Sequence, residues 1–141
     1  MKDTLFEQGL KRRRQVLGAE HTDGQIRNAD EFTKPMQVLA TKAAWGLVWS
    51  RPGVPRKLRS ILAIAFVLAR GKGEELNVHL RGAIRNDVTK AEIREIIMQS
   101  AIYCGFPEAM GGFRIAREFF RREGDKMIAA RARGRGKKQG K

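Results

Sequence analysis

The chain has 141 residues, of which 42% are hydrophobic and 31% charged, and this length and composition predict one folded domain rather than a disordered chain. A single cysteine, Cys104, excludes an internal disulfide, a Cys-x-x-Cys redox pair and a zinc ribbon. The longest apolar run, residues 61–69, is shorter than the roughly 20 residues of a membrane span, and the first residues do not read as a secretory signal. We therefore expect a cytoplasmic protein without a membrane segment.

The charge is strongly basic, with 29 Lys and Arg against 15 Asp and Glu and a net charge of +14. Half of that excess lies in residues 121–141, and a second basic cluster spans residues 11–14. Basic blocks of this kind bind nucleic acid or another polyanion, or simply keep a tail in solution. We favour the second interpretation and expect a helical domain over residues 1–123, followed by a basic, disordered tail over 124–141 with at most weak polyanion binding.

In chain order, the first predicted helix spans residues 5–17, with Thr4 as its N-cap and Gly18 as its end. The mixed polar residues 19–34 predict a loop. Pro35 suits the first turn of a second helix, which continues to Val48 and stops before Arg51-Pro52-Gly53.

The second half of the chain predicts four more helices, over about residues 55–70, 74–86, 90–104 and 107–122. The third helix contains the run 61–69, which is apolar on all faces and must be covered by other helices or by a partner chain. Thr89 and Glu92 form a capping box before the fifth helix. No segment alternates with a period of two, so the predicted fold class is all-α, with six helices.

Glu75 and His79 lie four residues apart on the fourth predicted helix, so their side chains share one face. Spacing alone favours a structural role for the pair. The functional alternative is an acid–base pair, in which the carboxylate raises the pKa of His79 and suits it to donate protons near neutral pH.

Trp45 and Trp49 have the same spacing, just before Arg51. They are either core or interface aromatics, or an apolar wall beside an arginine that binds a carboxylate in bidentate fashion. Other motifs are weak: Gly71-Lys72-Gly73 is too short for a phosphate loop, two distant His and one Cys make a poor metal set, and Cys104 reads as a buried thiol.

Several segments are similar to one known family over about residues 6–120. They are RRRQVLGAEHT at 12–22, NADEFTKPMQ at 28–37, WGLVWSRPG at 45–53, RSILAIA at 59–65, EELNVHLRGAIRN at 74–86, AEIREIIMQSAIYCGFP at 91–107 and FRIARE at 113–118. On these motifs the chain resembles the carboxymuconolactone decarboxylase family.

The resemblance implies an all-α, six-helix subunit in a homohexamer and a cofactor-free lyase of the protocatechuate branch of the β-ketoadipate pathway. The substrate would be 4-carboxymuconolactone, a dicarboxylate lactone, and the products the enol-lactone of 3-oxoadipate and CO₂. In this role Arg51 would bind the acetate arm, Trp45 and Trp49 would exclude water, and His79 with Glu75 would supply the proton. Neither a metal nor a cofactor is expected.

Alkylhydroperoxidase D-like proteins of the same superfamily carry two cysteines three residues apart, followed by a histidine. Aligned on His79, those positions hold Lys72 and Glu75, so the thiol pair is missing. Two other departures concern Asp87, where relatives usually have Gly, and the stretch around Met110, where decarboxylases often have Asn. A hydroperoxide-reducing enzyme, or one acting on another lactone or acid, is the alternative function, and a nucleic-acid-binding protein is a third.

Overall fold

The computed structural model describes residues 2–139, all of whose regular elements are helical. The chain divides into two compact units, one up to Arg59 and one from Ser60. The all-α fold class is therefore confirmed. Among the described residues no helix is both long and apolar enough to cross a membrane.

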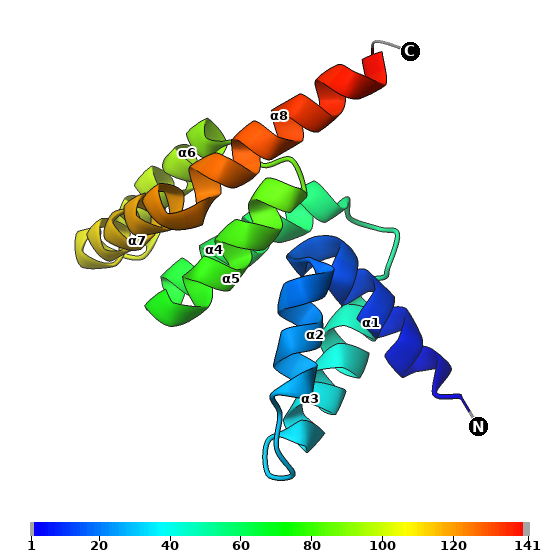
Figure 1. Cartoon of the computed structure of the whole chain (residues 1–141). Coiled ribbons are helices and arrows are strands. Elements are labelled where there is room, and N and C mark those ends of the chain that lie inside the picture. The colour runs from blue at the N-terminus through cyan, green and yellow to red at the C-terminus, as the bar shows by residue number, and fades with distance from the viewer. Residues whose placement is uncertain (1, 140–141) are drawn as a thin grey trace. The chain divides into compact units, whose positions relative to one another are not determined.

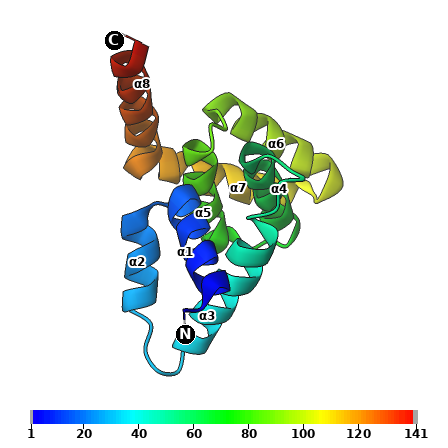
Figure 2. The ribbon, with the colours of Figure 1, turned by 90° about the vertical axis from the view of Figure 1, so that its right-hand side faces the viewer.

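Unit 1 contains α1 (Thr4–Leu17), α2 (Ala19–Arg27), α3 (Lys34–Ala40) and the π-helical segment η1 (Thr41–Val48), which continues α3. Within it α1 lies beside α2 and η1, as Figure 2 shows. Gly9 permits a close approach of α1 to η1, because a Cβ atom there would lie 2.0 Å from the carbonyl oxygen of Thr41.

The polar interior of unit 1 depends on Arg13, which is only 7% exposed. Its guanidinium donates to Gln37 Oε1 at 2.9 Å and to Thr41 Oγ1 at 3.1 Å, and Thr41 donates in turn to the Gln37 carbonyl. Because these partners are neutral, burial lowers the pKa of Arg13.

Two predictions for unit 1 are wrong. Residues 19–27 form α2 rather than a loop, because this weakly helical segment packs on α1. Asp3, not Thr4, caps α1 by accepting a hydrogen bond from the Phe6 amide. Gly18 does end α1, with a φ of 94°, and Pro35 does lie in the first turn of α3.

Unit 2 contains most of α4 (Arg56–Ala69), then α5 (Gly73–Arg85), α6 (Lys90–Tyr103), α7 (Phe106–Phe119), the π-helical segment η2 (Phe120–Gly124) and α8 (Asp125–Gln139). Its core is apolar and includes the fully buried side chains of Ile64, Leu80, Ile97 and Phe119. The capping box of Thr89 and Glu92 is present at the start of α6. One side of the run 61–69 is buried, whereas Phe66 is 63% exposed.

Residues 125–139 form α8, where the sequence predicted a disordered tail, so the chain has more helices than the six expected. None of the residues of α8 is buried, and Figure 1 shows its C-terminal end extending past the other helices of unit 2. Its first turns pack Met127 and Ile128 against the core, and Asp87, at a φ of 68°, accepts hydrogen bonds from Arg131 and Arg135 further along. These contacts offset part of the ordering cost on which the prediction rested.

Candidate functional site

Helix α5 carries the predicted acid–base pair. Its first turn holds Glu74 and Glu75, whose negative charges are favourable at a helix N-terminus. Leu76, Leu80 and Ala83 bury one face of the helix, which leaves His79 half-buried and Glu75 exposed. The structure therefore places the two side chains one helical turn apart at the edge of the core of unit 2.

The pKa of His79 lies below its ordinary value of 6.5, because burial disfavours the charged imidazolium. The Glu75 carboxylate raises the pKa, as the sequence predicted, but burial outweighs it. The expectation of a raised pKa is thus wrong, and His79 is neutral at pH 7 in the free protein.

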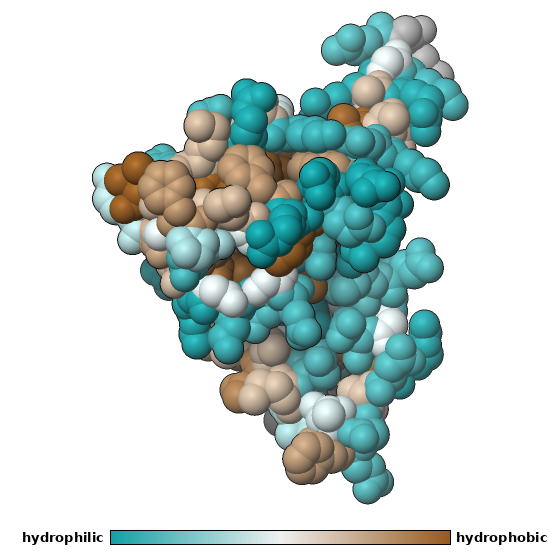
Figure 3. Space-filling view, turned by 90° about the vertical axis from the view of Figure 1, so that its left-hand side faces the viewer, coloured by the Kyte–Doolittle hydropathy of each residue, from teal (hydrophilic) through white to brown (hydrophobic). Residues whose placement is uncertain are grey.

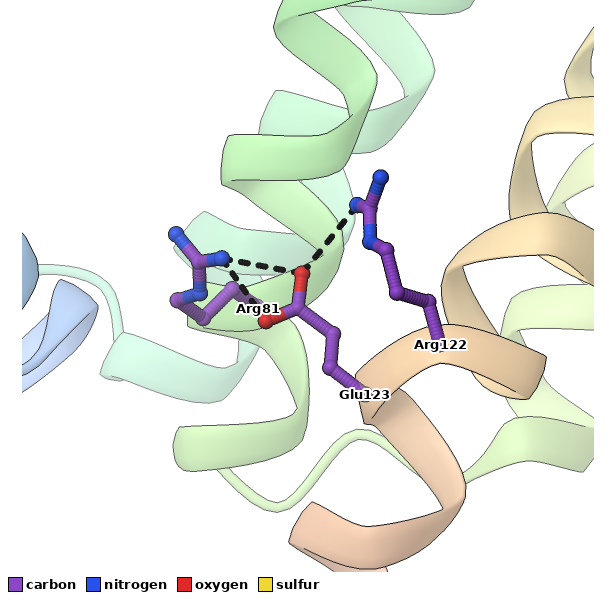
Figure 4. A network of polar contacts seen from close by, with 3 residues as sticks. All are labelled: Arg81, Arg122 and Glu123. Carbon is purple, nitrogen blue, oxygen red and sulfur yellow. Dashed lines mark hydrogen bonds and ion pairs between the residues drawn. The ribbon is translucent and has the colours of Figure 1, made fainter.

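A salt-bridge network holds the C-terminal half of α5 to η2 (Figure 4). Arg81 donates to both carboxylate oxygens of Glu123, at 2.9 and 2.8 Å, and Arg122 donates to one of them at 3.3 Å. Burial raises the pKa of Glu123, but these hydrogen bonds outweigh it and hold the pKa below its ordinary value. Sequence reasoning missed this network, because Arg81 and Glu123 are far apart in the chain.

Trp45, Trp49 and Arg51 lie in unit 1. The two indole rings contact each other, with centroids 4.9 Å apart and planes tilted by 32°. Trp45 is buried and Trp49 half-buried, so the pair is partly core and partly accessible. Arg51 is exposed, its carbonyl accepts a hydrogen bond from Arg59 at 3.2 Å, and its guanidinium forms no ion pair with the described residues. The tryptophan pair and the His79–Glu75 pair are thus each formed within a different unit.

A cavity of about 270 Å³ opens in unit 2 beside the start of α5. Its walls are mainly apolar and include Leu68, Leu76 and Ile115, together with the charged side chains Lys72 and Glu108. Neither His79 nor Glu75 lines it. The sequence did not predict this cavity. The glycines on either side of Lys72, which contribute to its lining, were interpreted only as too short a segment for a phosphate loop.

The remaining candidate residues are possible metal ligands and the single cysteine, Cys104. Within residues 2–139 no three side chains among His, Cys, Asp and Glu are grouped so that they could hold a metal ion. Cys104 is half-buried at the C-terminal end of α6, and its amide donates to the Ser100 carbonyl at 2.7 Å.

The family model described as the carboxymuconolactone decarboxylase family matches residues 36–118, more than half of the chain. The chain belongs to this family. The match includes Trp45, Trp49 and Arg51 of unit 1 and Glu75 and His79 of unit 2, whereas α1, α2 and α8 lie outside it.

Two relatives extend the similarity beyond the family model. The chain is 47% identical to nitrosuccinic acid decarboxylase of Metarhizium robertsii over 106 residues, which cover 75% of this chain and 74% of the relative. It is 40% identical to 4-carboxymuconolactone decarboxylase of Acinetobacter baylyi over 116 residues, which cover 82% and 87% of the two chains. Both relatives are named as decarboxylases, but of different acids.

Proposed function

We propose that this protein is a decarboxylase of small dicarboxylic acids that works without a cofactor, with 4-carboxymuconolactone as its first candidate substrate. The observation that carries the proposal is the similarity to two proteins named as decarboxylases, each over three quarters or more of this chain. The family domain contains Glu75 and His79, which are suited to the one proton transfer that such a reaction needs.

The reaction divides into bond breaking and protonation. In 4-carboxymuconolactone the departing carboxylate is lost as CO₂, and the electron pair of the broken C–C bond enters the ring alkene and the lactone carbonyl as a furanolate. A proton then adds to ring carbon. Because the ring itself accepts the electron pair, the chemistry requires from the protein a binding site for the dianion, stabilisation of the new oxyanion and a placed acid.

We assign the proton transfer to His79. The histidine is neutral in the free protein at pH 7, but a bound dianion favours the imidazolium and raises its pKa, as the charge of Glu75 does. The imidazolium would then stabilise the developing oxyanion and donate its proton to carbon, with Glu75 as its support. We assign to Arg51 the binding of the second carboxylate and to Trp45 and Trp49 the exclusion of water.

Nitrosuccinic acid is a second candidate substrate, favoured by the 47% identity to a nitrosuccinic acid decarboxylase. Loss of the carboxylate from the carbon that bears the nitro group leaves the electron pair in a nitronate, which is again protonated on carbon. The same site residues would therefore serve either acid. The two acids differ in the group that accepts the electron pair, a lactone in one and a nitro group in the other.

The test is CO₂ release by the purified full chain with each acid in turn, together with NMR analysis of the product formed in D₂O. Turnover of 4-carboxymuconolactone with one deuterium on ring carbon supports the first candidate, and turnover of nitrosuccinic acid alone replaces it by the second. No CO₂ release from either acid would contradict the proposal.

Hydroperoxide reduction is the competing activity within the superfamily. Because Lys72 and Glu75 occupy the positions of the relatives' cysteines, Cys104→Ser is expected to leave decarboxylation nearly unchanged. Thiol-dependent turnover of a hydroperoxide that this substitution abolishes would overturn the preferred function.

We also propose that the protein is a homo-oligomer, with the hexamer taken from the family resemblance. Helices α6 and α7 expose large apolar side chains, which include Ile102 at 74%, Tyr103 at 80% and Phe106 at 65%. Figure 3 shows apolar side chains gathered on the face that it presents. A second copy of the chain is the expected cover, because exposed apolar patches of this kind mark association sites. A stable monomer in sedimentation at micromolar concentration would contradict this proposal.

A further inference from the structure

Unit 1 contains a cavity of about 280 Å³, and each of the residues that line it has a polar or charged side chain. Four of its lining residues lie on one face of α1 at helical spacing, and the other two come from the turn after η1 and the start of α4. They are Gln8, Lys11, Arg12, Gln15, Ser50 and Arg56. Three of the six are cationic and none is acidic.

The charge on Arg12 is not compensated by a carboxylate of the described chain. Arg12 is half-buried, and its guanidinium donates to the neutral Gln15 Oε1 at 3.1 Å. Burial lowers the pKa of Arg12 most, and the positive charges of Arg56 and Arg59 lower it further, so these guanidinium groups repel one another. An anion in the cavity would relieve this repulsion.

Arg59 does not line the cavity, but its positive charge acts on Arg12. Its Nη2 donates to the Arg51 carbonyl at 3.2 Å, while its Nε is buried without a hydrogen-bond partner in the described structure. A buried polar group without a partner costs free energy unless a ligand or water satisfies it. The charged side chains that line the cavity are thus all cationic, and that of Arg12 also feels the charge of Arg59.

We propose that this cavity, with Arg12 and Arg56 as its main donors, binds a carboxylate group of a small dicarboxylic acid. Guanidinium groups bind carboxylates through paired hydrogen bonds, and a volume of about 280 Å³ lies at the small end of ligand sites, where a small acid fits and a polymer does not. This inference rests on the proposed function, because it names the residues that recognise the acid. It also adds Arg12 and Arg56 to Arg51, the carboxylate-binding residue expected from the sequence.

The experiment measures binding rather than turnover. Succinate is the probe, because it is a dicarboxylate without the lactone or nitro group that would accept an electron pair. Isothermal titration of the full chain is compared with that of Arg12→Gln, Arg56→Gln and the control Arg14→Gln. Arg14 carries the same charge on the same helix, but its guanidinium pairs with Asp23 at 2.7 Å and does not line the cavity.

We expect each cavity variant to weaken succinate binding by roughly tenfold or more, and Arg14→Gln to change it less than twofold. Equal binding by all four proteins, or no binding to the wild type, would overturn the inference. Inorganic phosphate that binds as tightly as succinate, with the same loss in Arg12→Gln, would overturn the assignment to carboxylates. Circular dichroism confirms that each variant is folded.

Failure of this inference can be told apart from failure of the proposed function. A chain that binds succinate through Arg12 but releases no CO₂ from either acid contradicts the decarboxylase proposal and leaves the cavity assigned. A chain that releases CO₂, but binds succinate equally well after substitution of Arg12 or Arg56, supports the decarboxylase proposal and contradicts the assignment of the cavity.

Discussion

The two units of this chain depend on different kinds of contact. In unit 1 the backbones of α1 and η1 meet at Gly9, and the buried side chain of Arg13 is held by neutral hydrogen-bond acceptors. In unit 2 the core is an apolar cluster around Ile64, Leu80 and Phe119, and Asn86 donates a buried hydrogen bond to Ser60 at 3.0 Å.

Under the proposed function, this difference would separate two tasks, the binding of carboxylates and the transfer of a proton. In unit 1 we propose that carboxylates bind in the cavity whose charged lining residues are all cationic. Unit 2 keeps His79 beside an apolar core, where burial favours the neutral imidazole and a bound anion can shift its pKa. Binding and proton transfer should therefore respond to different substitutions.

The largest expected effect is on turnover and falls on unit 2. His79→Gln keeps the size and hydrogen bonding of the side chain but cannot titrate, so we expect kcat to fall by about 10²–10⁴-fold, with a smaller change in KM. Glu75→Gln should cost less, because Glu75 supports His79 and transfers no proton. Steady-state CO₂ release measures the effect, with His21→Gln as the matched control. A folded His79→Gln protein with kcat within about threefold of the wild type would mean that water or another residue such as Lys57 supplies the proton.

The next largest effect is on stability and falls on unit 1. Gly9→Ala would place its Cβ 2.0 Å from a backbone oxygen that cannot rotate away, so we expect a loss of about 1–3 kcal/mol or more in the free energy of unfolding. In unit 2, Gly112→Ala meets Cδ2 of Leu68 at 2.6 Å, the end of a flexible side chain, and should cost less. Gly24→Ala meets nothing within 4 Å and should gain up to about 1 kcal/mol from helix propensity. Urea unfolding measures the free energy of unfolding of the three variants. An equal loss of this free energy in Gly9→Ala and Gly112→Ala would contradict the expected difference between the two units.

A smaller effect is the dependence of stability on pH. The pKa of His79 is lowered in the folded chain, so near and below pH 6.5 the unfolded chain binds more protons than the folded one. The stability that His79 contributes as a neutral imidazole is present above pH 6.5 and is lost as the pH falls. The free energy of unfolding should therefore decrease between pH 7.5 and pH 5.5. His79→Gln should remove this part of the decrease. Glu75→Gln should lower the pKa of His79 further, which NMR titration of the imidazole would detect; an unchanged or raised pKa would contradict the described environment.

The smallest effect is expected for α8. Its outer turns are held by exposed ion pairs of Asp87 with Arg131 and Arg135, and pairs of this kind contribute about 0–1 kcal/mol. A chain cut after Ala130 keeps Met127 and Ile128 and should match the wild type in urea unfolding and in turnover. A cut after Glu123 also removes those two side chains and should be somewhat less stable, yet still folded and active. Any polyanion binding by α8 should fall steeply as the salt concentration rises. A large loss of turnover by either truncated chain at physiological salt would show that α8 has a further role.

Local signals in the sequence predicted much of the fold. Gly18 and the Thr89–Glu92 capping box mark helix ends through the backbone and side-chain chemistry of single turns, which neighbours in the chain determine. The same holds for the shared face of Glu75 and His79 and for the contact of Trp45 with Trp49, because helical spacing alone brings such pairs together.

What the sequence by itself determined, then, was the helical class, the family and the neighbours along each helix. Three features were decided only by tertiary structure. Helix α2 forms because it packs on α1 in unit 1. The pKa of His79 is lowered because desolvation by a packed core outweighs one nearby carboxylate, and the cationic cavity forms because the start of α4 brings Arg56 toward α1. Each depends on groups far apart in the chain, whose burial and mutual repulsion no local pattern records.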